Sequence, residues 1–322
     1  MTQTISSDRC PADGGAVFDG HADLLWDAAR RRARGETHVL ERRHLDRLHR
    51  GGVEGLVLAV WAEAPDYAAD TRRQMEALRA EMAESGGFTL VRTAREAEAV
   101  RAEGRVYVFL AIEGMAAIGG NPEGIDRYAE AGARLGMLTW NEENALASGA
   151  GGDPVRGLSA LGRQAVRRME ERGMRIDVSH LNDGGFWDVM RLAEGPIIAS
   201  HSNCRALCPV PRNLTDSQLR AIRDTGGIVG LNAYCGFVHR EPALQTAETL
   251  ARHAAHMAEV MGAEHVACGF DFCGYMGPGN ESAAGLEDAS KIPDFFTCLE
   301  QFGFSEAERR MIARENFLRV LA

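Results

Sequence analysis

The chain has 322 residues, of which 45% are hydrophobic, and a formal net charge of −10 at pH 7. This length is large for an ordinary domain but normal for an α/β barrel with insertions, and the apolar content can fill the core of such a barrel. The negative charge argues against nucleic acid as a partner, because binding to phosphates requires clustered cations.

No segment predicts export or membrane insertion. Residues 1–16 contain no apolar stretch of the kind found in signal peptides, and no later run approaches the length of about 18 apolar residues that a membrane helix needs. The seven cysteines are scattered and form no CxxC pair. We therefore expect a cytoplasmic protein with reduced thiols and no membrane partner. Residues 1–322 are expected to form one catalytic domain, with a flexible tail at 1–15.

Short apolar runs alternate with helical segments along the chain. Strands are predicted at 16–18, 53–61, 106–112, 137–140, 176–178, 197–198, 227–231 and 265–269. Helices are predicted at 24–29, 66–85, 94–103, 123–134, 159–172, 183–193, 245–261, 291–301 and 305–320, with one surface helix between 30 and 50 and another after Thr215. Eight strands that alternate with helices indicate a parallel sheet closed into a (β/α)8 TIM barrel.

The first predicted strand leads directly into the segment DGHADLLWD, which places His21 and Asp23 just past its end. Alternate residues of an extended segment point the same way, and imidazole and carboxylate groups are good zinc ligands. The alternative is a turn in which Asp23 caps the following helix.

Glu113 follows the seven apolar residues of the third strand. A carboxylate in that position is costly to bury without a partner, so a metal ion or an arginine is expected beside it. The fourth strand delivers Asn141 to a glycine-rich loop at 144–157, which lacks the spacing of a phosphate-binding loop and is interpreted as a flap over the substrate.

Two β-branched runs, in IDVSH and in PIIASHSN, each end on a histidine, His180 and His201. Neighbouring parallel strands lie about 5 Å apart, so both imidazoles could reach one ion. The alternative is that each histidine caps a loop and bonds to the backbone. Tyr234 and Asp271 follow the seventh and eighth strands.

The remaining histidines are expected elsewhere. His38, His44 and His49 are predicted to lie in solvent, and His253 and His256 on an exposed helix face.

The polar residues at the predicted strand ends lie at one end of the barrel. They include three histidines and three carboxylates, a combination that favours a metal site: His21, His180, His201, Asp23, Glu113 and Asp271.

These residues lie in motifs that resemble those of the membrane (renal-type) dipeptidases, the M19 metallopeptidases of the amidohydrolase-like barrels. The motifs are DGHADLLW at 19–26, AIEG at 111–114, LTWNEENALASG at 138–149, IDVSH at 176–180, SHSNCRALCPVPRNLTD at 200–216, GFDFCG at 269–274 and GLEDASKIPDF at 285–295. They cover nearly the whole chain from Asp19 to Leu321, in the order of the family.

The resemblance implies two zinc ions per chain, one held by His21 and Asp23, the other by His180 and His201, with Glu113 as the bridge between them. The lysine content agrees with a carboxylate bridge. Related barrels often use a carbamylated lysine at a strand end, and the only lysine here, Lys291, lies in a loop after the eighth strand.

The resemblance also implies how a dipeptide would be recognised and cleaved. Asp271 would transfer a proton from the attacking water to the leaving amine, and Arg212 would bind the free carboxylate of the substrate. Asn141 and Tyr234 are further candidates for substrate contacts. In this family the C-terminal residue of the dipeptide can be a D-amino acid, and a homodimer is expected by analogy.

The sequence departs from the family pattern at two positions. Asn141 stands where better-known members have a histidine that orients the scissile carbonyl, and Cys273 stands where a second aspartate is usual. Two other functions stay open at this point. One is an amidase, deacylase or lactonase on the same barrel, and the other is a non-catalytic binding relative.

Overall fold

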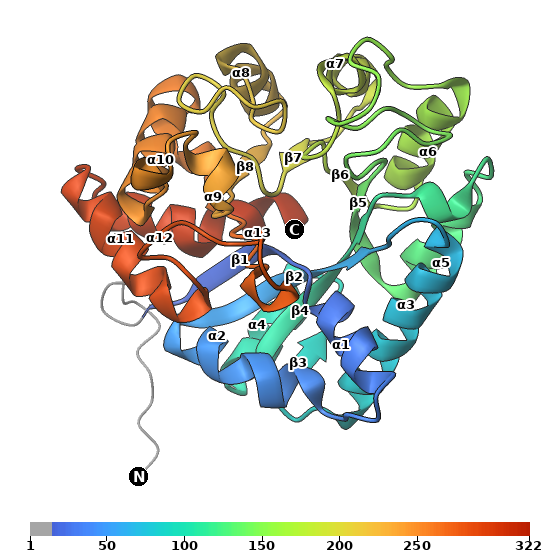
Figure 1. The fold of residues 1–322 in the computed structure, drawn as a ribbon, viewed down its shortest axis with the longest axis horizontal. Coiled ribbons are helices and arrows are strands. Elements are labelled where there is room, and N and C mark those ends of the chain that lie inside the picture. Colours follow the sequence, from blue (N-terminus) through green and yellow to red (C-terminus); the bar gives the residue numbers. More distant parts are fainter. Residues whose placement is uncertain (1–14) are drawn as a thin grey trace.

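The computed structural model describes residues 15–322, so the predicted tail lies outside the described residues except for Gly15. Helices surround a central group of parallel strands, and the C-terminus lies near the middle of the ring (Figure 1). The described residues contain no helix long and apolar enough to cross a membrane. The single domain over 1–322 stays a prediction, because it includes residues that are not described.

Eight of the strands described in residues 15–322 form the ring of a (β/α)8 TIM barrel, as predicted. One parallel sheet has the order β1 (Val17–Ala22), β2 (Val53–Trp61), β4 (Val106–Glu113), β5 (Ala133–Met137) and β6 (Arg175–Ile176). A second has the order β7 (Ile198–Ala199), β8 (Ile228–Leu231) and β9 (Val266–Cys268). The short strand β3 (Phe88–Leu90) pairs with the start of β4 and lies outside this ring.

The two sheets meet at both seams. Between β6 and β7, the Val178 N–H donates to Ile198 O at 2.8 Å. Between β9 and β1, the Phe270 N–H donates to the Asp19 carboxylate at 2.8 Å, and the Asp271 N–H donates to His21 O at 3.3 Å. The ring is therefore closed by direct bonds at each side.

Strand β4 shows why Glu113 faces the inside of the ring. Successive side chains of a strand point to opposite faces, so residues 107, 109, 111 and 113 share one face. Tyr107, Phe109 and Ala111 belong to a buried cluster that also holds inward residues from β1, β2, β5, β7, β8 and β9. Glu113 continues this inward row at the carboxyl end of the strand.

Thirteen helices are described in residues 15–322, and several begin at side chains that accept backbone N–H groups, such as Thr93, Ser159 and Thr215. They are α1 (Leu24–Arg32), α2 (Asp46–Arg50), α3 (Tyr67–Glu84), α4 (Ala94–Ala102), α5 (Gly124–Ala131), α6 (Ala160–Glu171), α7 (Asp183–Leu192), α8 (Asp216–Asp224), α9 (Cys235–Val238), α10 (Ala247–Met261), α11 (Ile292–Gln301), α12 (Glu306–Arg310) and α13 (Asn316–Leu321).

Helix α13 fills the end of the ring opposite to Glu113. Its Phe317 is buried and packs on Phe18 of β1, with ring centroids 5.0 Å apart. A Cβ atom on Gly20 would lie within 2.1 Å of the Phe317 ring, so this approach requires glycine. The interior is therefore packed with side chains at this end.

The fourth strand lies earlier than predicted, at Ala133–Met137 instead of 137–140. The preceding helix was predicted to continue to residue 134 and ends at Ala131, because Gly132 adopts a left-handed conformation with φ of 107°. The chain then pairs at once with β4 on one side and β6 on the other.

The prediction that His44 lies in solvent and His253 on an exposed helix face was wrong. His44 is buried and its Nε2 lies 2.9 Å from a carboxylate oxygen of Asp27. His253 is fully buried, where its Nδ1 accepts from the Cys204 N–H at 3.1 Å and its Nε2 donates to Val238 O at 2.8 Å.

The buried His253 predicts a pH-dependent contribution to stability, because burial lowers its pKa to about 4. Between pH 4 and 6.5 the unfolded chain binds a proton that the folded chain excludes, so stability is lost as the pH falls. The free energy of unfolding of the wild type, relative to that of His253→Gln, should be constant above pH 6.5. It should then decrease by up to about 3 kcal/mol towards pH 4 in urea titrations. A constant difference over the whole range would contradict the prediction.

Candidate metal centre

Polar side chains from five strand ends meet at one mouth of the ring. His21 lies near the end of β1 and Asp23 directly after it, Glu113 is the last residue of β4, and His180, His201 and Asp271 follow β6, β7 and β9. The five side chains of His21, Asp23, Glu113, His180 and His201 are all buried. The structure thus brings together every residue that the sequence places at this rim as a candidate metal ligand.

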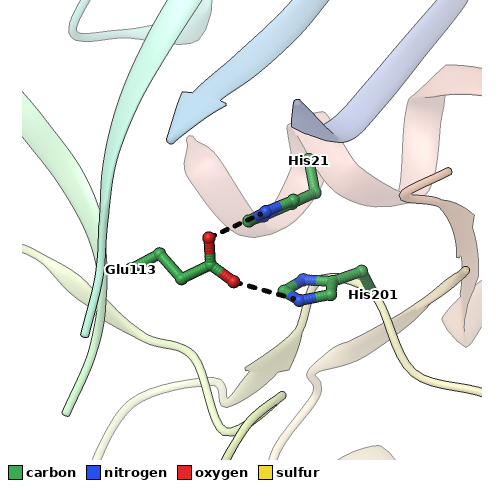
Figure 2. A group of neighbouring side chains, drawn as sticks. All are labelled: His21, Glu113 and His201. Carbon is green, nitrogen blue, oxygen red and sulfur yellow. Dashed lines mark ion pairs between the residues drawn. The ribbon is translucent and has the colours of Figure 1, made fainter. Parts of the chain in front are cut away.

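Glu113 lies at the centre of this group. Its Oε2 is 3.3 Å from His21 Nε2, and its Oε1 is 2.7 Å from His180 Nε2 and 3.5 Å from His201 Nε2. Figure 2 shows the carboxylate between His21 and His201, with one oxygen directed at each ring. The Nε2 atoms of His180 and His201 lie 2.8 Å apart.

Several buried atoms of this group have no hydrogen-bond partner in the protein. They include both ring nitrogens of His21, Oδ1 of Asp23 and Oε2 of Glu113. Two groups of three residues each offer ligand atoms that all lie within 4.8 Å of one another. The first group is His21, Glu113 and His201, and the second is His21, Asp23 and Asp271. Buried polar atoms are normally satisfied, so unpartnered nitrogen and oxygen donors around shared points fit a metal ion.

Burial controls the protonation of these residues. It lowers the pKa of His180 and His201 well below the ordinary value, so both imidazoles are neutral as metal ligation requires. It raises the pKa of Glu113 to about 8, with the charge of Asp23 adding to the effect. Burial opposes the charge on His21, but the carboxylates of Glu113 and Asp23 raise its pKa well above the ordinary value.

Neighbouring side chains orient two of the imidazoles. The Asn141 Oδ1 accepts a hydrogen bond from His180 Nδ1 at 3.0 Å, so that His180 Nε2 is the ring nitrogen that faces Glu113. The Nδ1 atom of His201 lies 2.8 Å from Ser200 Oγ. Such contacts fix the tautomer and the ring orientation of a metal-binding histidine.

Asp271 is held at both carboxylate oxygens. Asn232 Nδ2 donates to Oδ2 at 3.1 Å, and the Cys273 thiol donates to Oδ1 at 3.1 Å. Its backbone has a φ of 57°, an uncommon conformation for a residue with a side chain. Burial raises the pKa of Asp271, and the charge of Asp23 acts in the same direction. The carboxylate is therefore held at both oxygens and is easier to protonate than an ordinary aspartate.

Arg212 lies on the loop after β7 and is buried beside the histidines. One nitrogen of its guanidinium donates to Ser179 O, and Nη2 donates to His201 O at 3.3 Å and lies 3.2 Å from His180 Nε2. Within residues 15–322 no carboxylate bonds to its guanidinium, and its Nε has no hydrogen-bond partner. Burial lowers its pKa to about 10, so the group is still charged at neutral pH.

A hydrogen-bonded chain of asparagines connects Arg212 with Asp271. Asn213, next to Arg212, accepts from the Asn203 N–H at 3.2 Å. Asn203 in turn accepts from the Asn232 N–H at 3.0 Å, and Asn232 donates to Asp271. These asparagines are fully buried, so the cation and the carboxylate are held by one rigid unit.

These groups open into a cavity of about 340 Å³. It is lined by Asp23, Trp61, Glu113, Trp140, Asn141, His180, Arg212, Tyr234, Phe237, Asp271, Cys273, Met276, Gly279 and Asn280. Polar and charged groups thus share the cavity with four aromatic side chains, which suits a small molecule that has both charged and apolar parts.

A sequence model of the membrane dipeptidase family, peptidase family M19, matches residues 14–322. The chain belongs to this family. It is therefore a metal-dependent dipeptidase, an enzyme that hydrolyses peptide bonds. The family also confirms the resemblance found in the sequence motifs.

Relatives of this M19 dipeptidase include proteins of known structure. It is 30% identical to dipeptidase AC, a metallopeptidase of family M19, with a TM-score of 0.85 and coverage of 95% of this chain and 97% of the other. It is 28% identical to a Rhodobacter sphaeroides metallopeptidase bound to a phosphinate mimic of L-Ala-D-Ala, with a TM-score of 0.84 and coverage of 95% and 98%. An uncharacterized Klebsiella pneumoniae protein from the pqqA 5′ region is 35% identical over 259 residues, 77% of this chain and 94% of its own length.

Sequence reasoning missed several side chains that line the cavity of this dipeptidase, among them Phe237 and the two tryptophans Trp61 and Trp140. Each tryptophan was interpreted as the last residue of a buried strand, and that predicted position at a strand end was the available signal. The contacts of Asp271 with Asn232 and Cys273 were also missed, because they join residues whose spacing carries no pattern.

Removing the metal is expected to destabilise the enzyme, because the buried carboxylates of Asp23 and Glu113 would be left without a cation. Adding a chelator should lower the Tm by roughly 5–10 °C, and adding divalent zinc should restore it. In Glu113→Gln the chelator should have little effect, whereas Glu63→Gln, which alters a carboxylate outside this centre, should respond like the wild type. Equal responses of both variants would place the metal elsewhere.

Proposed function

We propose that this enzyme is a dizinc dipeptidase that hydrolyses dipeptides with a free C-terminal carboxylate. The observation that carries the proposal is that two features of the structure meet in one cavity. One is a buried cluster of histidines and carboxylates with unpartnered donor atoms, and the other is a buried arginine without a carboxylate partner among residues 15–322.

The metal part of the proposal assigns His21 and Asp23 to one zinc ion, His180 and His201 to the other, and Glu113 to both. Glu113 supports the bridging assignment because one of its oxygens faces His21 and the other faces His180 and His201. The mixture of imidazole and carboxylate donors suits zinc better than magnesium. Bound zinc ions would supply an activated water near neutral pH and polarise the scissile carbonyl.

A carboxylate bridge is further supported by the position of the lysine. Lys291 is about half exposed and pairs with Asp294, with 3.6 Å between Nζ and Oδ2. It lies outside the residues that line the cavity. It therefore cannot replace Glu113 as a carbamylated bridge.

Asp271 is proposed to accept the proton of the attacking water and to deliver it to the leaving amine. Its raised pKa suits this exchange, since a carboxylate with an ordinary pKa would hold the proton too weakly at neutral pH. The donors on its two oxygens, Asn232 and Cys273, keep it directed into the cavity.

Arg212 is proposed to bind the carboxylate of the substrate. A buried guanidinium without an anionic partner is costly, and the carboxylate of a bound dipeptide would supply that partner. Tyr234 lines the same cavity and is proposed to contact the substrate beside Arg212. Asn141 is proposed to act chiefly through His180, to which it is bonded.

Tolerance of a D-amino acid at the C-terminal position is part of the proposal. It is supported by the similar Rhodobacter sphaeroides enzyme, whose structure holds a mimic of L-Ala-D-Ala. The homodimer and the cytoplasmic location stay predictions.

The role of Asp271 can be tested with Asp271→Asn, which keeps the size and removes the proton acceptor. We expect kcat for L-Ala-L-Ala and L-Ala-D-Ala to decrease by roughly 100-fold or more, because general acid–base catalysis is lost. Metal analysis should still give two zinc ions per chain. A kcat close to that of the wild type would contradict the assignment, and a wild-type zinc content below two would contradict the dizinc proposal.

The role of Arg212 can be tested by comparing free dipeptides with dipeptide amides, which lack the carboxylate. Arg212→Ala should lower kcat/KM for free dipeptides by roughly 30-fold or more and change that for amides little. Arg240→Ala is the control, since Arg240 is exposed and bonds to Pro209 O. Equal losses on both substrate types would favour an amidase that does not read the carboxylate.

A further inference from the structure

Two aromatic pairs line the cavity, and they lie on different sides of it. Trp61 and Trp140 have ring centroids 5.1 Å apart, and Tyr234 and Phe237 have centroids 4.8 Å apart. Trp61 ends β2 and Trp140 lies after β5, whereas Tyr234 and Phe237 lie after β8. All four side chains line the cavity.

The order of strands places Trp61 across the mouth from Arg212. In the ring β1, β2, β4, β5, β6, β7, β8 and β9, strand β7 is the fourth strand along from β2. In a closed ring of eight strands these two lie on opposite sides. Trp61 is the last residue of β2, and the Arg212 loop follows β7.

Arg212 lies beside the aromatic pair formed by Tyr234 and Phe237. Its guanidinium carbon lies 5.3 Å from the ring centre of Phe237. A dipeptide whose carboxylate meets Arg212 therefore has its C-terminal residue near Phe237 and Tyr234. Its scissile carbonyl lies over the group around Glu113, and its N-terminal residue extends towards Trp61 and Trp140.

Trp140 is exposed in a way that ordinary packing does not explain. Trp140 is 36% exposed, and it is one of three large hydrophobic side chains in residues 15–322 that are exposed to this degree. It lies between Trp61 and His180, with a centroid distance of 6.0 Å to His180. Gly114, with a φ of 80°, allows the close approach, because a Cβ atom there would lie 3.0 Å from Trp140 N.

We propose that Trp61 and Trp140 form the subsite for the side chain of the N-terminal residue, and that this subsite selects large apolar and aromatic side chains. The inference rests on the proposed function, since it uses Arg212 to orient the dipeptide. A flat indole surface beside the reacting carbonyl gains apolar contact with phenylalanine or leucine and gains almost none with glycine.

The test compares N-terminal and C-terminal preference in the zinc-loaded enzyme. The substrates are Phe-Ala, Leu-Ala and Gly-Ala for the first, and Ala-Phe and Ala-Gly for the second. In the wild type, kcat/KM should be roughly 10- to 100-fold higher for Phe-Ala than for Gly-Ala. In Trp140→Ala this ratio should collapse towards one, in Trp140→Phe it should be partly retained, and the Ala-Phe to Ala-Gly ratio should stay as in the wild type.

Trp187→Phe is the matched control, because Trp187 lies on α7 and packs on Phe186, with centroids 5.0 Å apart. It should leave both ratios unchanged. Binding gives a second readout, since a phosphinate mimic of Phe-Ala should change tryptophan fluorescence in the wild type and much less in Trp140→Phe.

The possible outcomes separate the two proposals. An unchanged Phe-Ala to Gly-Ala ratio in Trp140→Ala, with dipeptides still hydrolysed, overturns the subsite and leaves the proposed function intact. A change confined to the C-terminal preference overturns the orientation. A zinc-loaded wild type that hydrolyses none of these dipeptides overturns the proposed function and the subsite together.

Discussion

The buried carboxyl group of Glu113 is the constraint on which the mouth of the barrel depends. The alternation of side chains along β4 directs this carboxylate inwards after a row of apolar residues, where an isolated charge would cost several kcal/mol. Three imidazoles surround it, and two of them are kept neutral by burial. Burial raises the pKa of Glu113 to about 8, and a bound cation would stabilise its charged form, so metal binding, protonation and stability are linked at this point.

A second requirement is that groups with different tasks keep a fixed separation. Arg212 and Asp271 lie on loops after different strands, and Asn203 and Asn232 join these loops through buried hydrogen bonds. Under the proposed function, a substrate whose carboxylate binds Arg212 would thereby be presented to Asp271 in one geometry. This explains why polar side chains with no chemistry of their own are fully buried here.

Much of the fold and of the candidate site could be predicted from the sequence, because the signals are local. An apolar run followed at once by Glu113 marks both a strand and the polar residue at its end. Features that depend on distant partners could not be predicted. His253 looked like a surface residue because its partners, Cys204 and Val238, are far away in the chain. Trp140 was predicted to end a strand because an indole side chain that lines a cavity is as apolar as a side chain in the core.

The packing of α13 against one end of the ring determines how substrates enter the cavity and how products leave it. Phe317 and its neighbours fill the end of the barrel opposite to Glu113, so the active-site cavity is closed at its base and opens only at the mouth. A long polypeptide cannot pass through such a cavity, and any part of a substrate that is longer than the cavity is deep must protrude from the mouth. Both amino acids released by cleavage must leave by the route that the next molecule uses to enter.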